Sequence, residues 1–303
     1  MIRFVKKTIV FAVVCYVLLL VLDILISNKL KPNMPSNNSD LVLLGSSRCQ
    51  EHFDTNIISD SLGLSAFNIG LRGSKIDIHY MLLKEYLDFV PSKPQYLTYV
   101  FDIHDNNFSN NTIYRHYQFF PLLLYNLNYY NVLKTYAGFD NYLFFVPMFR
   151  YSGYIKVMYG GFDYFLYRGY YNINSHGLKD KDYVCLLDQD SINYAYTYDS
   201  TTVVCYLEKI INLCKINNIQ LNLVYAPEYY ICRNVKNRDK VFSLYRLIAL
   251  KNNIPLEDFS VDSSLNANNS YFSDILHLNR KGAEVFTSSY YVPYMKNLIK
   301  NCE

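Results

Sequence analysis

Short apolar runs alternate with amphipathic segments near both ends of this 303-residue chain, and this alternation constrains the fold more than any other feature. The run Asp40-Leu-Val-Leu-Leu-Gly45 is apolar almost throughout and ends in glycine, which is typical of a strand buried on both faces of a parallel sheet. Longer segments between such runs show helical periodicity. The expected strands cover residues 40–45, 65–70, 95–101, 219–225 and 254–259, and the expected helices cover 54–62, 74–90, 201–217, 238–252 and 280–300.

Strands that alternate with helices usually pair in parallel, joined by right-handed crossovers that place helices on both faces of the sheet. We therefore expect residues 40–303 to form an α/β domain, a three-layer α/β/α flavodoxin-like sandwich with a parallel five-stranded sheet. The composition, 51% hydrophobic and 18% charged, suits a chain with a large core. The net charge of +3 is too small, and too scattered along the chain, to indicate a nucleic-acid partner.

The N-terminal residues predict a transmembrane helix. An apolar run over residues 8–26, interrupted only by Asp23, has about the length that spans a bilayer. Three positive charges within residues 1–7 precede the run, whereas Lys29 and Lys31 follow it, which favours a cytoplasmic N-terminus. A cleaved signal peptide is the alternative, but no small-x-small cleavage site follows the run. We expect a single-pass signal anchor in the cell membrane, with the C-terminal domain outside the cytoplasm.

Two further segments complete the expected domain organisation. Residues 1–31 hold the cytoplasmic tip and the anchor, and residues 32–39, rich in Pro, Asn and Ser, form a polar linker. The stretch at about 109–200 is rich in Tyr and Phe and shows no clean alternation of strands and helices. A connection of this length needs structure of its own, so we expect a helical insertion packed on the main domain. The alternative is a lid or acceptor-binding subdomain, since aromatic faces suit sugars and acyl chains.

The turn Asp274-Ile-Leu-His277 carries the residue pair most typical of catalysis. An Asp and a His three residues apart lie on one face of a single helical turn. There the carboxylate can accept the imidazole Nδ1–H and leave Nε2 free to act as a base. Such a base needs a nucleophile, and Ser47, which follows the first strand, is the best candidate. Each residue alone has a structural alternative, Ser47 as a turn or N-cap residue and His277 as a helix-start residue capped by Asp274.

Position in the predicted sheet supports the pairing. Ser47, Gly73 and the segment 102–106 follow the first three strands, and Asp274 and His277 precede the last helix. Because the carboxyl ends of parallel strands meet at one edge, where ligands bind in such sheets, we expect these residues to lie together.

The order and spacing of these motifs resemble the SGNH (GDSL-type) hydrolase superfamily, over roughly residues 40–105 and 200–300. The motifs are Gly-x-Ser at residue 47, Asn-x-Gly-x-x-Gly ending at residue 73 and Asp-x-x-His-x-Asn from residue 274. The resemblance implies that Ser47 is the nucleophile and that Asp274 and His277 complete a catalytic triad. It also implies that the backbone N–H groups of Ser47 and Gly73 form an oxyanion hole.

Two positions depart from the family pattern. Ser46 stands where the family usually has Asp before the nucleophile, which resembles membrane-anchored members that handle acyl groups on cell-envelope polymers. In Phe101-Asp-Ile-His-Asp-Asn106, His104 stands where the family usually has an Asn that donates to the oxyanion. A neutral His can also donate this hydrogen bond. Loss of one oxyanion donor typically lowers the rate by about a hundred- to a thousandfold.

Two arginines, Arg48 and Arg72, flank the expected mouth of the site and would meet an anionic substrate there. Their alternative interpretation is that of ordinary surface or sheet-edge residues. The seven cysteines show no Cys/His spacing of a zinc site, and we expect neither a metal nor a cofactor.

The functional hypothesis is a membrane-anchored SGNH-type serine esterase or O-acyltransferase that acts on acyl esters of envelope glycans. Its expected partners are an acylated glycan or other ester substrate, the lipid bilayer and a membrane-bound O-acyltransferase. The altered segment 102–106 motivates an alternative, a catalytically weak SGNH-like binding or assembly component of a polysaccharide-modification system. A third hypothesis, a flavodoxin-like binding domain without chemistry, leaves the ordered Ser, Gly and Asp-x-x-His positions unexplained.

Overall fold

The computed structural model describes residues 2–30, 38–103, 130–132, 134, 146–147, 200–230 and 238–301. The chain divides into two compact units, residues 1–33 with 111–167 and residues 34–110 with 168–303. His104 and nearly all of the expected insertion at about 109–200 lie outside the described residues. Both therefore stay predictions.

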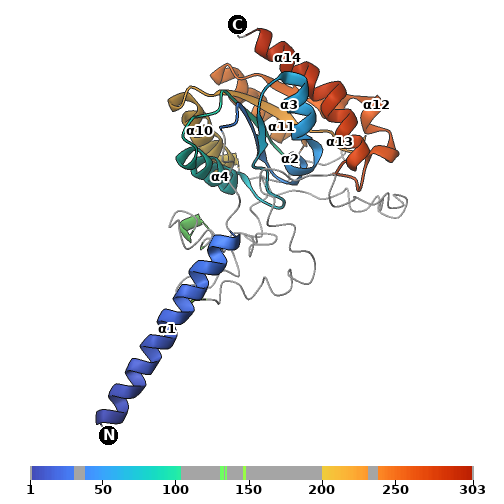
Figure 1. Ribbon diagram of the computed structural model, residues 1–303. Coiled ribbons are helices and arrows are strands. Elements are labelled where there is room, and N and C mark those ends of the chain that lie inside the picture. Colours follow the sequence, from blue (N-terminus) through green and yellow to red (C-terminus); the bar gives the residue numbers. More distant parts are fainter. Residues whose placement is uncertain are drawn as a thin grey trace. The chain divides into compact units, whose positions relative to one another are not determined.

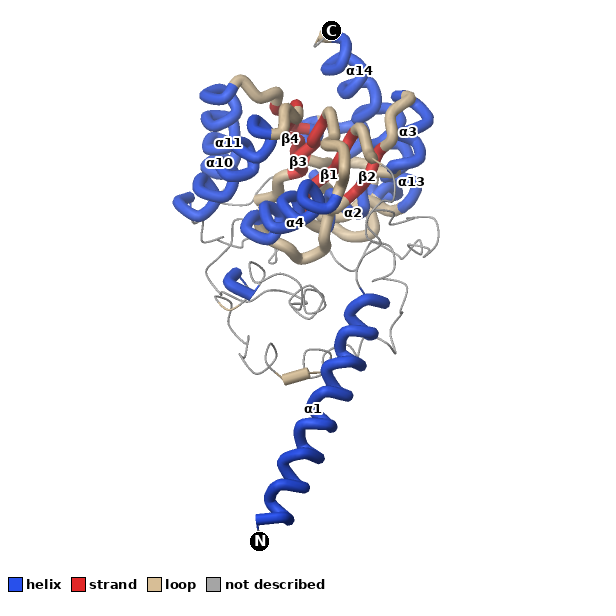
Figure 2. The backbone as a smooth tube through the Cα atoms, turned by 60° about the vertical axis from the view of Figure 1, so that its left-hand side comes forward, coloured by secondary structure: helices blue, strands red, loops and turns tan. Residues whose placement is uncertain are grey.

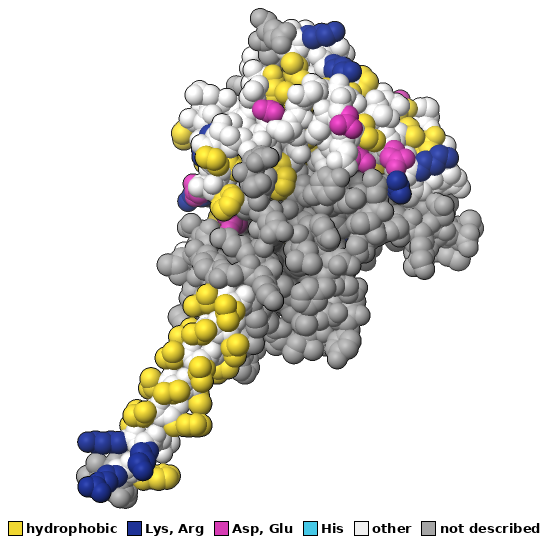
Figure 3. Space-filling model, in the orientation of Figure 1, with side chains coloured by type: hydrophobic (Ala, Val, Ile, Leu, Met, Phe, Trp, Pro, Cys, Tyr) yellow, Lys and Arg dark blue, Asp and Glu magenta, His cyan; other side chains and the backbone are white. Residues whose placement is uncertain are grey.

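The first unit contains α1 (Ile2–Leu30). Its segment Arg3–Leu25, with a mean hydropathy of 2.8, is long and apolar enough to cross a membrane. Hydrophobic side chains line the described surface of this helix, with Lys and Arg side chains at its start (Figure 3). The expected N-terminal apolar helix is thus present, and its insertion into a membrane and its orientation there stay predictions.

The second unit is organised around a sheet of five parallel strands in the order β2-β1-β3-β4-β5. This is the predicted flavodoxin-like topology. The outer strands are shorter than expected, three residues each, and they lie at the two ends of this strand order. The strands are β1 (Leu41–Gly45), β2 (Ala66–Asn68), β3 (Tyr96–Val100), β4 (Gln220–Tyr225) and β5 (Leu256–Asp258).

Helices cover both faces of the sheet (Figures 1 and 2). One layer consists of α4 (Ile76–Phe89), α10 (Ser200–Ile216) and α11 (Arg238–Asn252). The other consists of α3 (Thr55–Leu62), α13 (Arg280–Phe286), a π-helical turn (Thr287–Tyr291) and α14 (Val292–Lys300). The predicted three-layer α/β/α sandwich is confirmed.

The side chains of β3 alternate between these two layers, as the pleat of a strand requires. Tyr99 points to the first layer, where its hydroxyl lies 3.1 Å from His79 Nδ1 of α4. Its neighbour Thr98 points to the second layer, where its Oγ1 lies 2.7 Å from the Tyr291 hydroxyl. Both β3 residues are fully buried, so the sheet is covered on both faces at this strand. A ligand can therefore reach the strand only at an edge of the sheet.

The C-terminal helix expected over residues 280–300 contains the π-helical turn, which the sequence pattern did not predict. In this turn the Val292 N–H donates to the Thr287 carbonyl, five residues earlier. The next residue, Pro293, has no N–H and its ring disfavours a carbonyl four residues before it, so the regular α-helical ladder is interrupted here.

Short elements occupy the carboxyl edge of the sheet. They are α2 (Ser47–His52), the 3₁₀ turns η7 (Phe259–Val261) and η8 (Asn269–Tyr271), and α12 (Ser263–Asn266). An isolated antiparallel bridge joins Phe272 to Leu278 and closes the loop between them.

Candidate active site

Ser47 is the first residue of α2, two residues beyond the end of β1. Gly45 makes this sharp exit from the sheet possible, because a Cβ atom there would lie 2.4 Å from the Val100 carbonyl oxygen and 2.8 Å from Cys49 Cβ. The Ser47 side chain is half-buried. Its N–H lies in the first turn of α2, where a helix offers no carbonyl acceptor, so this donor is available to a ligand.

The Asp274–His277 segment is a turn closed by a side chain. The prediction of a helical turn is wrong here, because residues 273–276 form bends outside any helix. The Asp274 Oδ1 accepts the N–H of Leu276 at 2.8 Å and that of His277 at 2.9 Å, which replaces helical bonding by an Asx turn. The Ser273 N–H donates to the His277 carbonyl at 2.7 Å. The turn nevertheless keeps the two side chains adjacent.

Three side chains are connected by two short contacts, one at each nitrogen of the His277 ring. The Asp274 carboxylate lies 2.8 Å from His277 Nδ1, through Oδ2, and His277 Nε2 lies 2.8 Å from Ser47 Oγ. The carboxylate accepts only, so Nδ1 carries the proton and Nε2 is the acceptor for the Ser47 hydroxyl. This is the geometry of a nucleophile, a base and a group that orients the base.

Electrostatics around His277 favour its protonated form. Burial by itself lowers the pKa of His277, but the hydrogen bond to Asp274 and the negative charges of Glu51 and Asp274 outweigh burial and raise the pKa above 6.5. Burial by itself raises the pKa of Asp274, but its hydrogen bonds to His277 and to the two turn N–H groups lower it below 3.8. The pair therefore holds an ionised carboxylate against a base that is readily protonated.

The loop that carries Gly73 is held at every neighbouring N–H. The Leu71 N–H donates to the Gly45 carbonyl at 2.9 Å, the Arg72 N–H to Gln50 Oε1 at 3.0 Å and the Ser74 N–H to the Leu71 carbonyl at 3.1 Å. Gly73 has φ of +71°, which suits glycine at the third position of a tight turn. Its own N–H donates to no other described residue and is therefore free for a ligand.

Arg48 does not line the mouth of the site, contrary to the sequence-based prediction. Its side chain is only 1% exposed, and its Nε donates to Asp102 Oδ2 at 2.5 Å. Its Nη1 donates to the Ala226 carbonyl at 3.1 Å and lies 3.5 Å from Glu228 Oε2. A buried guanidinium must be paired in this way, and its partners follow β3 and β4, which no local sequence pattern reveals.

Arg72 is 29% exposed and forms an ion pair with Glu51, whose carboxylate is buried. Both its Nε and its Nη2 are directed at Glu51 Oε1. The positive charge of Arg72 is thus largely balanced within the protein, so contact with an anionic substrate stays a prediction that the geometry does not favour.

Comparisons with known proteins find matches among solved structures only. No family model matches the chain, and no curated protein matches it. A structure from Bacteroides fragilis, assigned as an acylhydrolase, is 14% identical, with a TM-score of 0.43, over 88% of this chain and 92% of that one. A GDSL-like lipase from Bacteroides thetaiotaomicron is 10% identical, with a TM-score of 0.42, over 91% of each chain.

A third structure, from Desulfitobacterium hafniense and assigned to the G-D-S-L family of lipolytic proteins, is 12% identical, with a TM-score of 0.43. The match covers 84% of this chain and 99% of that one. At such identities and TM-scores the likeness decides nothing about activity, so the chemistry of this chain has to be inferred from its own site.

Two histidines without an expected partner prove to be bonded near the site. His52, in α2, accepts the Leu278 N–H at Nε2 over 3.0 Å. His79, in α4, lies with Nε2 2.8 Å from Ser74 Oγ, next to Gly73. Burial lowers the pKa of both, that of His79 to about 3, so both rings are neutral. Leu278, the partner of His52, is distant in the sequence, so only the fold reveals that pairing.

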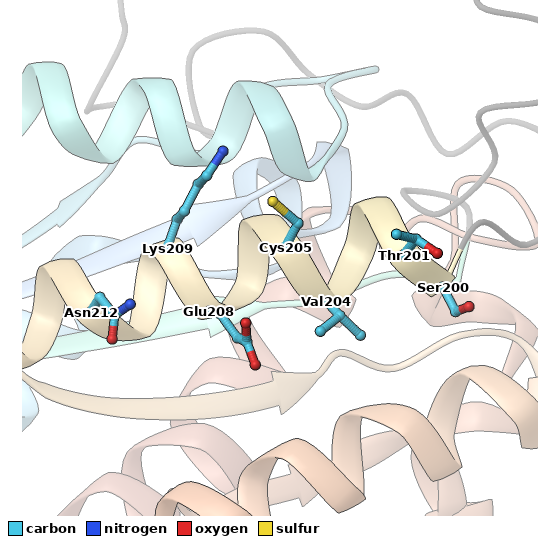
Figure 4. A pocket seen from close by; sticks show the side chains of 7 residues that line it. All are labelled: Ser200, Thr201, Val204, Cys205, Glu208, Lys209 and Asn212. Atoms are coloured by element: carbon cyan, nitrogen blue, oxygen red, sulfur yellow. The ribbon is translucent and has the colours of Figure 1, made fainter.

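A pocket along α10 lies apart from these residues in the sequence and includes no member of the triad (Figure 4). Its Lys209 side chain extends toward α4, where Nζ lies 5.7 Å from the centroid of the Tyr80 ring. The residues that line it are Ser200, Thr201, Val204, Cys205, Glu208, Lys209 and Asn212. All of them come from one helix, α10.

Proposed function

We propose that this protein is a serine ester hydrolase or O-acyltransferase of the SGNH type, with Ser47, His277 and Asp274 as its catalytic triad. The observation that carries the proposal is the contact of 2.8 Å between His277 Nε2 and Ser47 Oγ, together with the contact between Asp274 and Nδ1 of the same ring. A serine hydroxyl is a poor nucleophile until such a base takes its proton.

In the proposed reaction, Ser47 Oγ attacks the carbonyl carbon of an ester while His277 Nε2 takes the hydroxyl proton. Asp274 stabilises the imidazolium that forms. The tetrahedral oxyanion accepts hydrogen bonds from the Ser47 and Gly73 N–H groups, the two free donors described above. Return of the proton from His277 to the leaving oxygen breaks the ester bond and leaves an acyl group on Ser47.

The acyl-enzyme is then resolved by a hydroxyl compound. Water, deprotonated by His277, gives hydrolysis, whereas a sugar hydroxyl in the same position gives acyl transfer. His104 is proposed as a third oxyanion donor by its sequence position alone. None of these steps uses a metal or a cofactor.

The proposed substrates are acyl esters of envelope glycans. The apolar helix α1, if it spans the cytoplasmic membrane with its N-terminus inside, holds the α/β domain at the outer surface, where such polymers lie. A membrane-bound O-acyltransferase that supplies or uses the acyl group is the partner this arrangement favours.

Labelling by a fluorophosphonate probe tests the proposal, since such probes react with activated serines. Full-length protein in detergent is compared with Ser47→Ala, His277→Ala and the control Ser46→Ala, whose hydroxyl forms no capping hydrogen bond with α2. We expect labelling of the wild type and of the control only. No labelling of any of them, together with no turnover of aryl acetates, would favour the binding or assembly role instead.

A further inference from the structure

The second half of α2 contacts both loops that flank Ser47. Gln50 Oε1 accepts the Arg72 N–H at 3.0 Å, and the Glu51 carboxylate pairs with the Arg72 guanidinium. Gln50 is 7% exposed and Glu51 only 1%, so these contacts are made away from solvent. They hold the loop in which Gly73 directly follows Arg72.

The next residue, His52, holds the opposite loop. Its ring is fully buried, and Nε2 accepts the N–H of Leu278, the residue after the proposed base. The His52 and His277 rings meet edge to face, with centroids 6.2 Å apart and planes at 88°. Because Nε2 accepts a proton donor, this ring must be neutral, and burial together with the nearby charges of His277 and Arg48 keeps its pKa well below 6.5.

The end of α2 is itself fixed by the C-terminal helix. Thr287, in the π-helical turn, donates its hydroxyl to the His52 carbonyl at 3.2 Å and accepts the Asp54 N–H at 3.1 Å. Thr287 is fully buried, so water cannot replace these two bonds at low cost. The π-helical turn thus places a hydroxyl group against the end of the helix that begins with Ser47.

We propose that the last turn of α2, residues 50–52, is the positioning element of the site: one short helix carries the nucleophile and also sets the oxyanion loop and the base loop relative to it. Gln50 and Glu51 act on the loop of Gly73, and His52 acts on the turn of Asp274 and His277. These are positioning residues that touch no substrate. The proposal rests on the proposed function for its kinetic consequences but not for its structural ones.

A matched pair of substitutions at His52 tests the hydrogen bond itself. His52→Gln keeps an acceptor near the position of Nε2, whereas His52→Met has a similar length and no comparable acceptor. In full-length protein we expect His52→Met to lower kcat for an aryl acetate by about 10- to 100-fold with KM changed less than about twofold, because misplacement by about 1 Å has that effect. His52→Gln should stay within about fivefold of the wild type.

Amide hydrogen exchange separates this proposal from the proposed function. In peptides that span residues 273–279, exchange should be faster in His52→Met than in the wild type and should return toward wild type in His52→Gln. Faster exchange in a protein without any esterase activity would contradict the function and leave the positioning role standing. Equal exchange and equal kcat in the two variants would overturn the positioning role.

A second pair guards against failure of a His52 variant to fold. Thr287→Val removes the hydroxyl group at nearly constant volume, and Thr287→Ser keeps it. We expect Thr287→Val to lower kcat by about 3- to 10-fold and to speed exchange at residues 50–54, with Thr287→Ser close to the wild type. If Val and Ser variants match in both readouts, the end of α2 does not position the site.

Discussion

His277 Nε2 and Ser47 Oγ lie 2.8 Å apart although 230 residues separate them in the sequence. The contact exists because β1 delivers Ser47 to the carboxyl edge of the sheet and the loop closed by the Phe272–Leu278 bridge brings His277 to the same edge. The proposed catalytic role of both residues has consequences for pH dependence and for substitutions.

Activity should fall on the acidic side of a midpoint above 6.5. The proposed base must be neutral to take the Ser47 proton, and Asp274 and Glu51 raise the pKa of His277 despite its burial. Asp274→Asn removes one hydrogen-bonded charge, so the acid limb of kcat/KM should move to lower pH while the rate falls by about three to four orders of magnitude. A pH–rate profile for aryl acetate hydrolysis, measured for the wild type and for Asp274→Asn, checks the midpoint and its displacement. An acid limb that does not move in Asp274→Asn would contradict the assignment of that limb to His277.

Loss of Arg48 should destabilise the α/β domain strongly. Arg48→Met removes the cation that pairs with Asp102 and lies near Glu228 in this buried network, and breaking a buried ion pair typically costs about 3–5 kcal/mol. For a domain of this size that corresponds to a fall of roughly 6–20 °C in the unfolding midpoint. Calorimetry of the full-length protein measures it.

The matched control for Arg48 is the exposed pair of Arg280 and Glu284, whose side chains are 52% and 43% exposed. Arg280→Met removes the same kind of ion pair in water, where such pairs contribute less than about 1 kcal/mol. Equal falls in the unfolding midpoint of Arg48→Met and Arg280→Met would mean that the buried network does not stabilise the fold.

Acid should weaken the fold through His79. Burial lowers the pKa of this ring to about 3, whereas in the unfolded chain it titrates near 6.5. The unfolded state therefore binds the proton first as pH falls below 6.5, and each further pH unit lowers the free energy of unfolding by about 1.4 kcal/mol until the folded ring titrates as well.

Urea unfolding of the wild type and of His79→Gln at pH 7.5 and pH 5 measures the contribution of His79 to the free energy of unfolding. Between these two pH values the free energy of unfolding should fall by about 2 kcal/mol more in the wild type than in the variant. Equal losses in wild type and variant would show that His79 is not held neutral in the folded protein.

The sequence predicted the sheet because β1 is a continuous apolar run, and because β3 and β4 are mostly apolar and almost entirely buried. The outer strands β2 and β5 were predicted too long, since the expected ranges 65–70 and 254–259 extend beyond the three residues that each strand contains. Ser47 and the Asp274–His277 pair were recognisable because each motif is local in sequence.

Contacts between distant segments were not recognisable. Arg48 was predicted to line the mouth of the site because it directly follows Ser47 in the sequence. The sequence does not show that its side chain is buried and paired with the carboxylate of Asp102. The Asp274–His277 turn looked helical because the spacing of three residues suits a helix equally well as an Asx turn. His52 and Thr287 have no local motif, and only the packing of α2 against the Leu278 loop and the C-terminal helix gives them partners.

The proposed acyl-enzyme is tested most directly by locating the covalent adduct. Full-length protein is treated with a fluorophosphonate, digested and mapped by tandem mass spectrometry, with Ser47→Ala treated in parallel. We predict one stoichiometric adduct on Ser47 Oγ, absent from the variant. An adduct on another serine, or an unmodified Ser47 in folded wild-type protein, would contradict the catalytic triad.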